Sequence, residues 1–127
     1  MKKVLSVGQC GADHGAISFM LSRNFTVSVD SADSVNEALA AAKEGYDLVL
    51  VNRVLDRSGE SGLDLIRQMQ SDEQLVSVPV ILVSNYADAQ QEAVDAGAQP
   101  GFGKAQLHAP ELLEQLTPIL SSSESES

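Results

Sequence analysis

The chain has 127 residues, 43% of them hydrophobic and 20% charged, which is typical of one soluble globular domain. Its formal net charge of −10 argues against nucleic acid and anionic membranes as partners, because both would repel it. No apolar run approaches the roughly 18 residues of a membrane span, and a single cysteine excludes an internal disulfide. We find no signal peptide and expect a cytoplasmic protein that binds another protein.

Apolar periodicity predicts two strand and helix pairs in the first third of the chain. Residues 4–7 form a short apolar run, and apolar residues then recur at helical spacing over 16–21. Asp13 is the expected N-cap of this helix. Alternation over 25–29 predicts a second strand, and the capping-box sequence 34–37 predicts the start of a second helix.

Residues 46–52 predict the central strand, around which we expect the chain to be organised. Four consecutive branched apolar residues, 48–51, are typical of a strand covered on both faces in a parallel sheet. Asn52 follows them directly. Open α/β sheets bind ligands at the carboxyl ends of their strands, so we expect Asn52 on the floor of any pocket.

The second half of the chain repeats the pattern. A loop over 53–61 precedes a helix, residues 78–83 predict a fourth apolar strand, and an alanine- and glutamine-rich helix follows over 87–96. Residues 109–116 predict the last helix. Five strand and helix units in alternation predict a parallel sheet with helices on both faces.

Two features limit the predicted domain at its end. Pro118 is expected to end or kink the last helix. Residues 121–127, which contain only serine and glutamate, have nothing to bury and are expected to form a disordered tail. The predicted domain therefore spans residues 1–120.

The order and spacing of four segments resemble the receiver domain of two-component response regulators over about residues 2–120. The resemblance rests on residues 46–51, 61–66, 78–84 and 96–98, the last followed by Lys104. It implies a flavodoxin-like, doubly wound sheet of five parallel strands in the order 2-1-3-4-5. It also implies a place in a phosphorelay, with a histidine kinase or a downstream effector as partner.

The family's chemistry is phosphoryl transfer to an aspartate at the end of the third strand, with Mg²⁺ held by acidic residues. Asn52 stands at the acceptor position, and a neutral amide is a poor nucleophile. Gly8 and Gln9 stand where the acidic pair would follow the first strand. Ser84 and Lys104 match the family's hydroxyl and lysine. We expect these two side chains to hydrogen-bond Asn52 and Gln9.

We therefore expect an atypical, non-phosphorylatable receiver domain that is no enzyme, needs no cofactor or metal, and binds a signalling protein. The expected partner face contains Tyr86, Gln90 and Gln91, and a one-residue shift from Gly101 would add the aromatic Phe102. A solvated helix face is the competing interpretation of these residues. The sequence predicts no oligomeric state.

Three alternatives stay open. The degenerate pocket could bind a small anion or metabolite. Cys10 with His14 could form a thiolate sensor, although a free cysteine is usually a small buried hydrophobe. Asp13, Asp56 and Glu60 could form a displaced metal or phosphoacceptor site, although acidic residues near helix starts and loop tips are usually caps.

Overall fold

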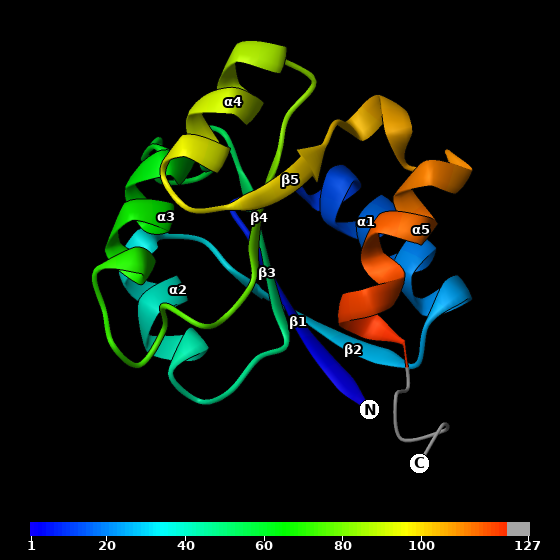
Figure 1. The fold of residues 1–127 in the computed structure, drawn as a ribbon, viewed down its shortest axis with the longest axis horizontal. Helices are drawn as coiled ribbons and strands as arrows, with labels where there is room; N and C mark the ends of the chain where they lie inside the picture. Colours follow the sequence, from blue (N-terminus) through cyan, green and yellow to red (C-terminus); the bar gives the residue numbers. More distant parts are fainter. Residues whose placement is uncertain (122–127) are drawn as a thin grey trace.

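A computed structural model describes residues 1–121 of the chain, and its strands and helices alternate throughout (Figure 1). A short 3-10 helix, η1, precedes the last α-helix. In chain order the elements are β1 (Lys2–Val7), α1 (Gly11–Asn24), β2 (Val27–Ala32), α2 (Val35–Ala42), β3 (Leu48–Asn52), α3 (Gly62–Gln70), β4 (Val80–Val83), α4 (Ala87–Asp95), β5 (Gln99–Phe102), η1 (Lys104–Gln106) and α5 (Pro110–Leu120).

The five strands form one parallel sheet in the order β2-β1-β3-β4-β5, which confirms the predicted flavodoxin-like fold. Val7 of β1 pairs with Val51 of β3, and Asn52 pairs with Val83 of β4. Because parallel strands all end at the same edge, the residues that follow β1, β3 and β4 meet there.

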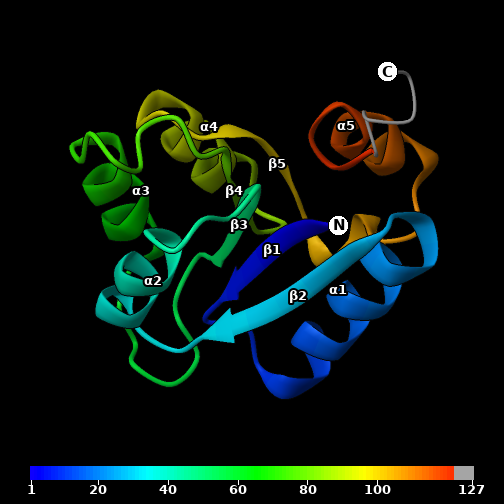
Figure 2. The ribbon, with the colours of Figure 1, turned by 90° about the horizontal axis from the view of Figure 1, so that it is seen from below.

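Two apolar cores cover the two faces of the sheet. Helices α2, α3 and α4 pack on one face and α1 and α5 on the other (Figures 1 and 2). Residues 48–51 of β3 are fully buried and divided between the two cores. Burial on both faces explains why this strand has an unbroken apolar sequence.

Serine side chains cap the starts of α2 and α3, whereas α1 has no side-chain cap. Ser34 Oγ accepts a hydrogen bond from Glu37 N at 3.1 Å, and Ser61 Oγ accepts one from Leu63 N at 3.2 Å. The prediction that Asp13 caps α1 is wrong, because the helix begins at Gly11 with Cys10 as its N-cap. Asp13 lies in the first turn and is free to pair elsewhere.

The prediction that Pro118 ends the last helix is wrong, because α5 continues to Leu120, and a kink at Pro118 stays a prediction. Leu112, Leu116 and Leu120 of this helix are all buried in the core shared with α1. Their burial favours the continuous helix and offsets the hydrogen bond that the missing N–H of proline cannot make.

The predicted serine and glutamate tail over 121–127 lies outside the described residues, apart from Ser121. Within residues 1–121, the helices are all too short or too polar to cross a membrane.

Candidate functional site

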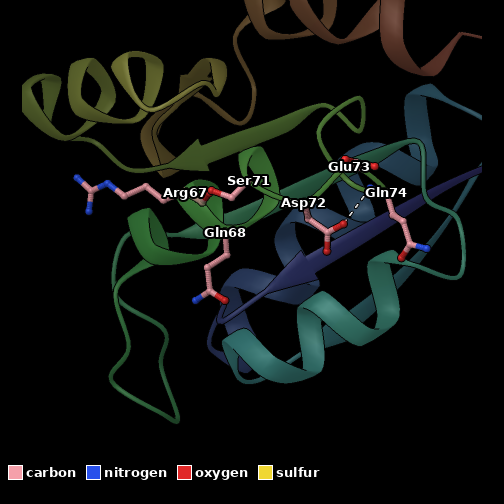
Figure 3. Close-up of a pocket in the computed structure, with 6 residues that line it drawn as sticks. All are labelled: Arg67, Gln68, Ser71, Asp72, Glu73 and Gln74. Carbon is pink, nitrogen blue, oxygen red and sulfur yellow. Dashed lines mark hydrogen bonds between the residues drawn. The ribbon is translucent and has the colours of Figure 1, made fainter.

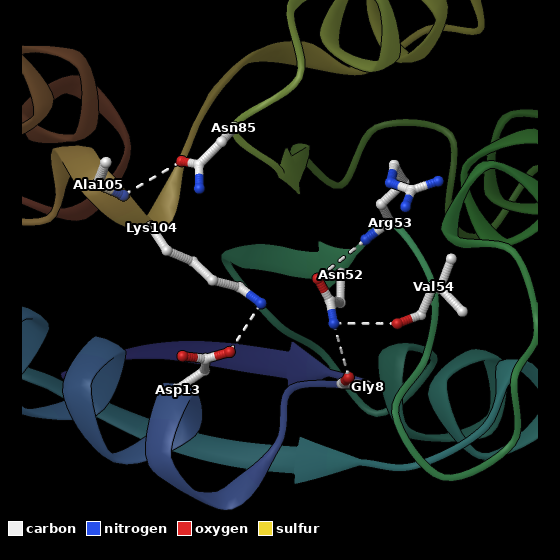
Figure 4. Close-up of polar contacts among 8 residues, drawn as sticks. All are labelled: Gly8, Asp13, Asn52, Arg53, Val54, Asn85, Lys104 and Ala105. Carbon is white, nitrogen blue, oxygen red and sulfur yellow. Dashed lines mark hydrogen bonds and ion pairs between the residues drawn. The ribbon is translucent and has the colours of Figure 1, made fainter.

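The carboxyl edge of the sheet brings together the residues that the sequence singled out. Gly8 follows β1, Asn52 ends β3 and Ser84 follows β4, while Lys104 begins η1 just after β5. Figure 4 shows Gly8, Asn52 and Lys104 around this edge. Their convergence follows from the sheet order, because β1, β3 and β4 are neighbours.

The Asn52 side chain is held by backbone groups. Its Nδ2 donates to Gly8 O at 3.2 Å and to Val54 O at 3.0 Å, and its Oδ1 accepts from Arg53 N at 3.1 Å (Figure 4). The amide therefore joins two carbonyl oxygens and uses both of its N–H groups. The predicted hydrogen bonds from Lys104 and Ser84 to Asn52 are wrong.

Lys104 instead forms an ion pair with Asp13 in the first turn of α1. The two charged groups are 2.7 Å apart, with side chains 33% and 32% exposed (Figure 4). The hydrogen bond from Lys104 is the largest cause that lowers the pKa of the Asp13 carboxyl below its ordinary value of 3.8, while partial burial opposes it. The expected amide partners of Lys104 are thus replaced by a carboxylate across the pocket.

Ser84 and Gln9 have different roles from those expected. Ser84 is buried, and its Oγ accepts from Tyr86 N at 3.1 Å at the start of α4. The amide atoms of Gln9 are buried and have no hydrogen-bond partner within the described residues. The predicted contact between Gln9 and Lys104 is therefore wrong as well.

Leu55 is a residue that sequence reasoning missed. It is fully buried, and a Cβ built on Gly8 would lie only 2.8 Å from Leu55 Cα. Gly8 has φ +74°, and its carbonyl also accepts from Asp56 N at 2.9 Å. The loop after β3 thus folds over the end of β1, where the family's acidic pair is expected. The signal in the sequence was an apolar pair, Val54 and Leu55, in an otherwise polar loop.

Gln90 ties α4 to the sheet. Its Nε2 donates to three carbonyl oxygens, those of Leu82 at 2.9 Å, Ser84 at 3.0 Å and Phe102 at 3.3 Å. This is possible because Gly101 has no side chain, and a Cβ there would overlap Leu82 O and Gln90 Oε1. We call this set of contacts the Gln90 clamp.

The clamp corrects part of the predicted partner face. Gln90 is half-buried and directed at the sheet, and Phe102 is only 2% exposed, so neither side chain is available to a partner. Tyr86 is 59% exposed and Gln91 is exposed, with its Nε2 bonded to Asp95 at 2.9 Å. Of the predicted face, Tyr86 and Gln91 therefore lie on the surface.

The residues at this edge do not fit a divalent cation. Within residues 1–121, no group of three or more His, Cys, Asp or Glu side chains is placed to hold a metal ion. The suggested set of Asp13, Asp56 and Glu60 is divided, since Asp13 pairs with Lys104 and Glu60 Oε1 accepts from Val35 N at 2.8 Å. Gly8 and Gln9 supply no carboxylate, and the Asn52 amide directs N–H groups at the carbonyl oxygens beside it.

The proposed thiolate sensor gains no geometric support. Cys10 is half-buried, and the ring Nε2 of His14 lies 3.4 Å from Ser18 Oγ. His14 N donates to Cys10 O as part of the first turn of α1. These contacts are those of a helix start.

Two clefts differ in what they contain. One of about 400 Å³ opens beside Asn52 and is lined by Asn52, Arg53, Val54, Val83, Ser84, Asn85, Tyr86 and Lys104. A larger one of about 630 Å³ lies at the end of α3 and is lined by Arg67, Gln68, Ser71, Asp72, Glu73 and Gln74 (Figure 3). The larger cleft contains none of the predicted site residues, so the smaller one is the candidate site.

Comparison with known proteins agrees with the fold and identifies the family. The model of the response regulator receiver domain matches residues 13–117, and the chain therefore belongs to this family. Receiver domains act in signal transduction, where they interact with kinases and effectors. No curated protein matches the sequence.

Solved structures of response regulators have the same fold at low sequence identity. A putative response regulator from Chloroflexus aurantiacus has a TM-score of 0.81 at 19% identity, covering 93% of this chain and 96% of that one. The chemotaxis response regulator CheY4 of Vibrio cholerae has a TM-score of 0.73 at 21% identity, covering 94% and 99%. A response regulator from Burkholderia pseudomallei, solved with a phosphorylated aspartic acid and a calcium ion, has a TM-score of 0.70 at 22% identity, covering 99% and 70%.

Proposed function

We propose that this chain is an atypical receiver domain that accepts no phosphoryl group and presents a fixed surface to a signalling protein, either a histidine kinase or a downstream effector. The observation that carries the proposal is Asn52 at the end of β3. Both N–H groups of its amide are donated to backbone carbonyls, of Gly8 and Val54. The lone pair of an amide nitrogen is delocalised into its carbonyl group, and the Asn52 Oδ1 accepts from Arg53 N, so this side chain is a poor nucleophile toward phosphorus.

The charges around Asn52 support the same reading. Phosphoryl transfer needs positive charge on the transferred oxygens, normally from Mg²⁺ and a lysine. Here Lys104 is already paired with Asp13, and Gly8 and Gln9 offer a cation no carboxylate. Neither charge is therefore available for the transfer.

The surface is fixed by the contacts of α4. The Gln90 clamp joins this helix to β4 and β5, and Ser84 Oγ holds the backbone at its first turn through Tyr86 N. Hydrogen bonds from one side chain to carbonyl oxygens of β4, of Ser84 and of β5 oppose movement of the helix over the sheet, while the Gln90 Oε1 is buried without a partner within the described residues. We therefore propose that the α4 surface is recognised without a phosphorylation step.

Intact-mass spectrometry tests the proposal. Parent protein incubated with a small-molecule phosphodonor and Mg²⁺ is expected to keep its mass, because it has no acceptor carboxylate at Asn52. Asn52→Asp serves as the comparison, and it too should react poorly because the residues after β1 stay uncharged. A base-labile phosphate adduct on the parent would contradict the proposal, and peptide mapping would then show whether Asp56 had accepted it.

A second candidate function, binding of a small anion or metabolite, has one observation in its favour. The buried amide of Gln9 lacks hydrogen-bond partners within the described residues, and a polar ligand would supply them if it displaced the residues that separate Gln9 from the cleft, which Gln9 does not line. The pairing of Lys104 with Asp13 weighs against it, because the lysine charge is already neutralised. A ligand that binds only the folded state raises its melting temperature. Phosphate, sulfate and nucleotide panels that leave the melting temperature unchanged would exclude binding of these anions.

A further inference from the structure

A groove between the loop after β3 and the start of α4 adjoins the cleft beside Asn52, with which it shares Arg53, Val54 and Tyr86. It has a volume of about 520 Å³, and its apolar floor contains Val54, Leu63, Tyr86 and Ala89. Val54 is 43% and Tyr86 59% exposed, so two of the large hydrophobic side chains exposed in residues 1–121 line the same groove. Isolated exposed hydrophobics are ordinary, but two that share a groove indicate a binding surface.

The two rims of the groove carry opposite charge. On one rim, the guanidinium of Arg53 lies over the Tyr86 ring, 5.1 Å from its centroid. On the α4 rim, Asp88 and Glu92 have no ion-pair partner within residues 1–121. Helix α4 contains no basic residue, so its exposed surface carries unbalanced negative charge.

We propose that this groove binds a segment of another protein in which an apolar side chain is flanked by lysine or arginine. The apolar side chain enters between Val54 and Tyr86, and the basic residues lie over Asp88 and Glu92. Arg53 on the opposite rim repels them and so keeps the basic residues on the α4 side of the groove. The net charge of −10 increases the rate at which a basic partner is encountered.

This inference rests on the proposed function, because it names the partner chemistry of the fixed surface. The Gln90 clamp holds α4 in place, and with it Asp88, Ala89 and Glu92 on the rim. A rim that does not need ordering on binding loses less conformational entropy. The groove is small compared with a standard interface, which suits the anchor of a weak, transient complex.

A titration followed by amide chemical shifts tests the inference. The probe is a synthetic peptide of alternating lysine and leucine, added to ¹⁵N-labelled protein at low ionic strength. We expect shifts at Val54, Leu63 and Ala89. A peptide with glutamate in place of lysine should give none, and one with serine in place of leucine should bind at least about tenfold more weakly.

Matched charge variants separate the groove from general attraction to an acidic protein. Asp88→Asn with Glu92→Gln is expected to weaken binding about tenfold. Glu111→Gln with Glu114→Gln removes the same charge from α5 and should leave affinity within about twofold of the parent. Equal losses in both double variants, or shifts centred on α5, would overturn the inference.

Two further results would overturn the proposed binding of a basic, apolar segment in the groove. Shifts at Val54 and Ala89 that depend on the concentration of the protein alone would mean that a second copy occupies the groove, which overturns the proposed partner. A peptide that binds the parent and Tyr86→Ala equally well would overturn the apolar anchor. Neither result would bear on phosphoryl transfer, because that proposal is decided by the mass measurement.

Discussion

The ion pair between Asp13 and Lys104 predicts a measurable coupling energy. In a double-mutant cycle of Asp13→Asn and Lys104→Met, followed by denaturant unfolding, we expect a coupling of about 1 kcal/mol, because the pair is short and only about one third exposed. The pair Asp64 and Arg67 is the control, since it is 3.8 Å apart and about 60% exposed. Its coupling should be near zero. Equal couplings in the two cycles would show that the pocket pair is an ordinary surface contact.

The same pair predicts how stability depends on pH. The pKa of the Asp13 carboxyl is lower in the folded protein than its ordinary value of 3.8, so between the two values the unfolded chain binds more protons. The contribution of the pair is therefore fully present above pH 3.8 and is lost as pH falls through the folded pKa. In denaturant melts, the difference between parent and Asp13→Asn should shrink over that window. A difference that stays constant across that window would contradict the assigned pKa shift.

Substituting alanine for Gly8 is expected to lower the free energy of unfolding, because Leu55 occupies the space that the added Cβ would need. Gly8 and Gly59 both have φ +74°, but a Cβ on Gly59 would meet nothing within 4 Å, whereas one on Gly8 would overlap Leu55. Gly8→Ala should therefore destabilise the protein by about 2 kcal/mol more than Gly59→Ala, in denaturant melts. Equal losses would mean that the loop over Gly8 moves freely aside.

The position of Leu55 also opposes restoring an acidic residue of the family at Gly8. Gly8→Asp places its Cβ where Leu55 lies, in addition to the strain at positive φ. Asn52→Asp alone supplies one carboxylate at this position. Adding Gly8→Asp requires the loop that contains Leu55 to rearrange.

At the scale of single elements, the Gln90 clamp can be tested directly. Gln90→Ala leaves Leu82 O and Ser84 O without the amide that they now share, and we expect a loss of about 2 kcal/mol in the free energy of unfolding. Gln91→Ala, on the exposed face of the same helix, should cost less than about 0.5 kcal/mol. Hydrogen exchange in α4 should accelerate only in the first variant. Similar effects of both would show that the clamp does not fix the helix.

The strands and helices themselves were largely predictable, and the exceptions have physical causes. Residues 48–51 and the capping-box sequence 34–37 are local signals, and each led to the correct element. Gln90 was misassigned because a polar residue on a helix predicts solvent, while the space that admits it comes from Gly101 on another element. The predicted helix end at Pro118 was wrong because the local cost of the proline is outweighed by the burial of Leu120 in the core.

For the whole molecule, the pattern of strands and the resemblance together predicted which residues meet at the carboxyl edge but not which atoms bond there. Gly8, Asn52, Ser84 and Lys104 converge because the sheet order brings their strand ends together. The partner of Lys104 was not predictable, since Asp13 resembled a helix cap and became a partner only through the packing of α1 beside η1. Leu55 was missed because loop conformation sets its burial.

The most direct test of the central claim is a ¹⁵N spectrum of the parent protein with beryllofluoride and Mg²⁺. Beryllofluoride activates the NtrC4 receiver domain, whose solved structure is similar to this chain. We predict an unchanged spectrum, because Asn52 offers no carboxylate and the Gln90 clamp already fixes α4. Saturable shifts around Asn52 and Lys104 that extend into α4 would show that the pocket accepts the phosphoryl analogue, and would contradict the claim.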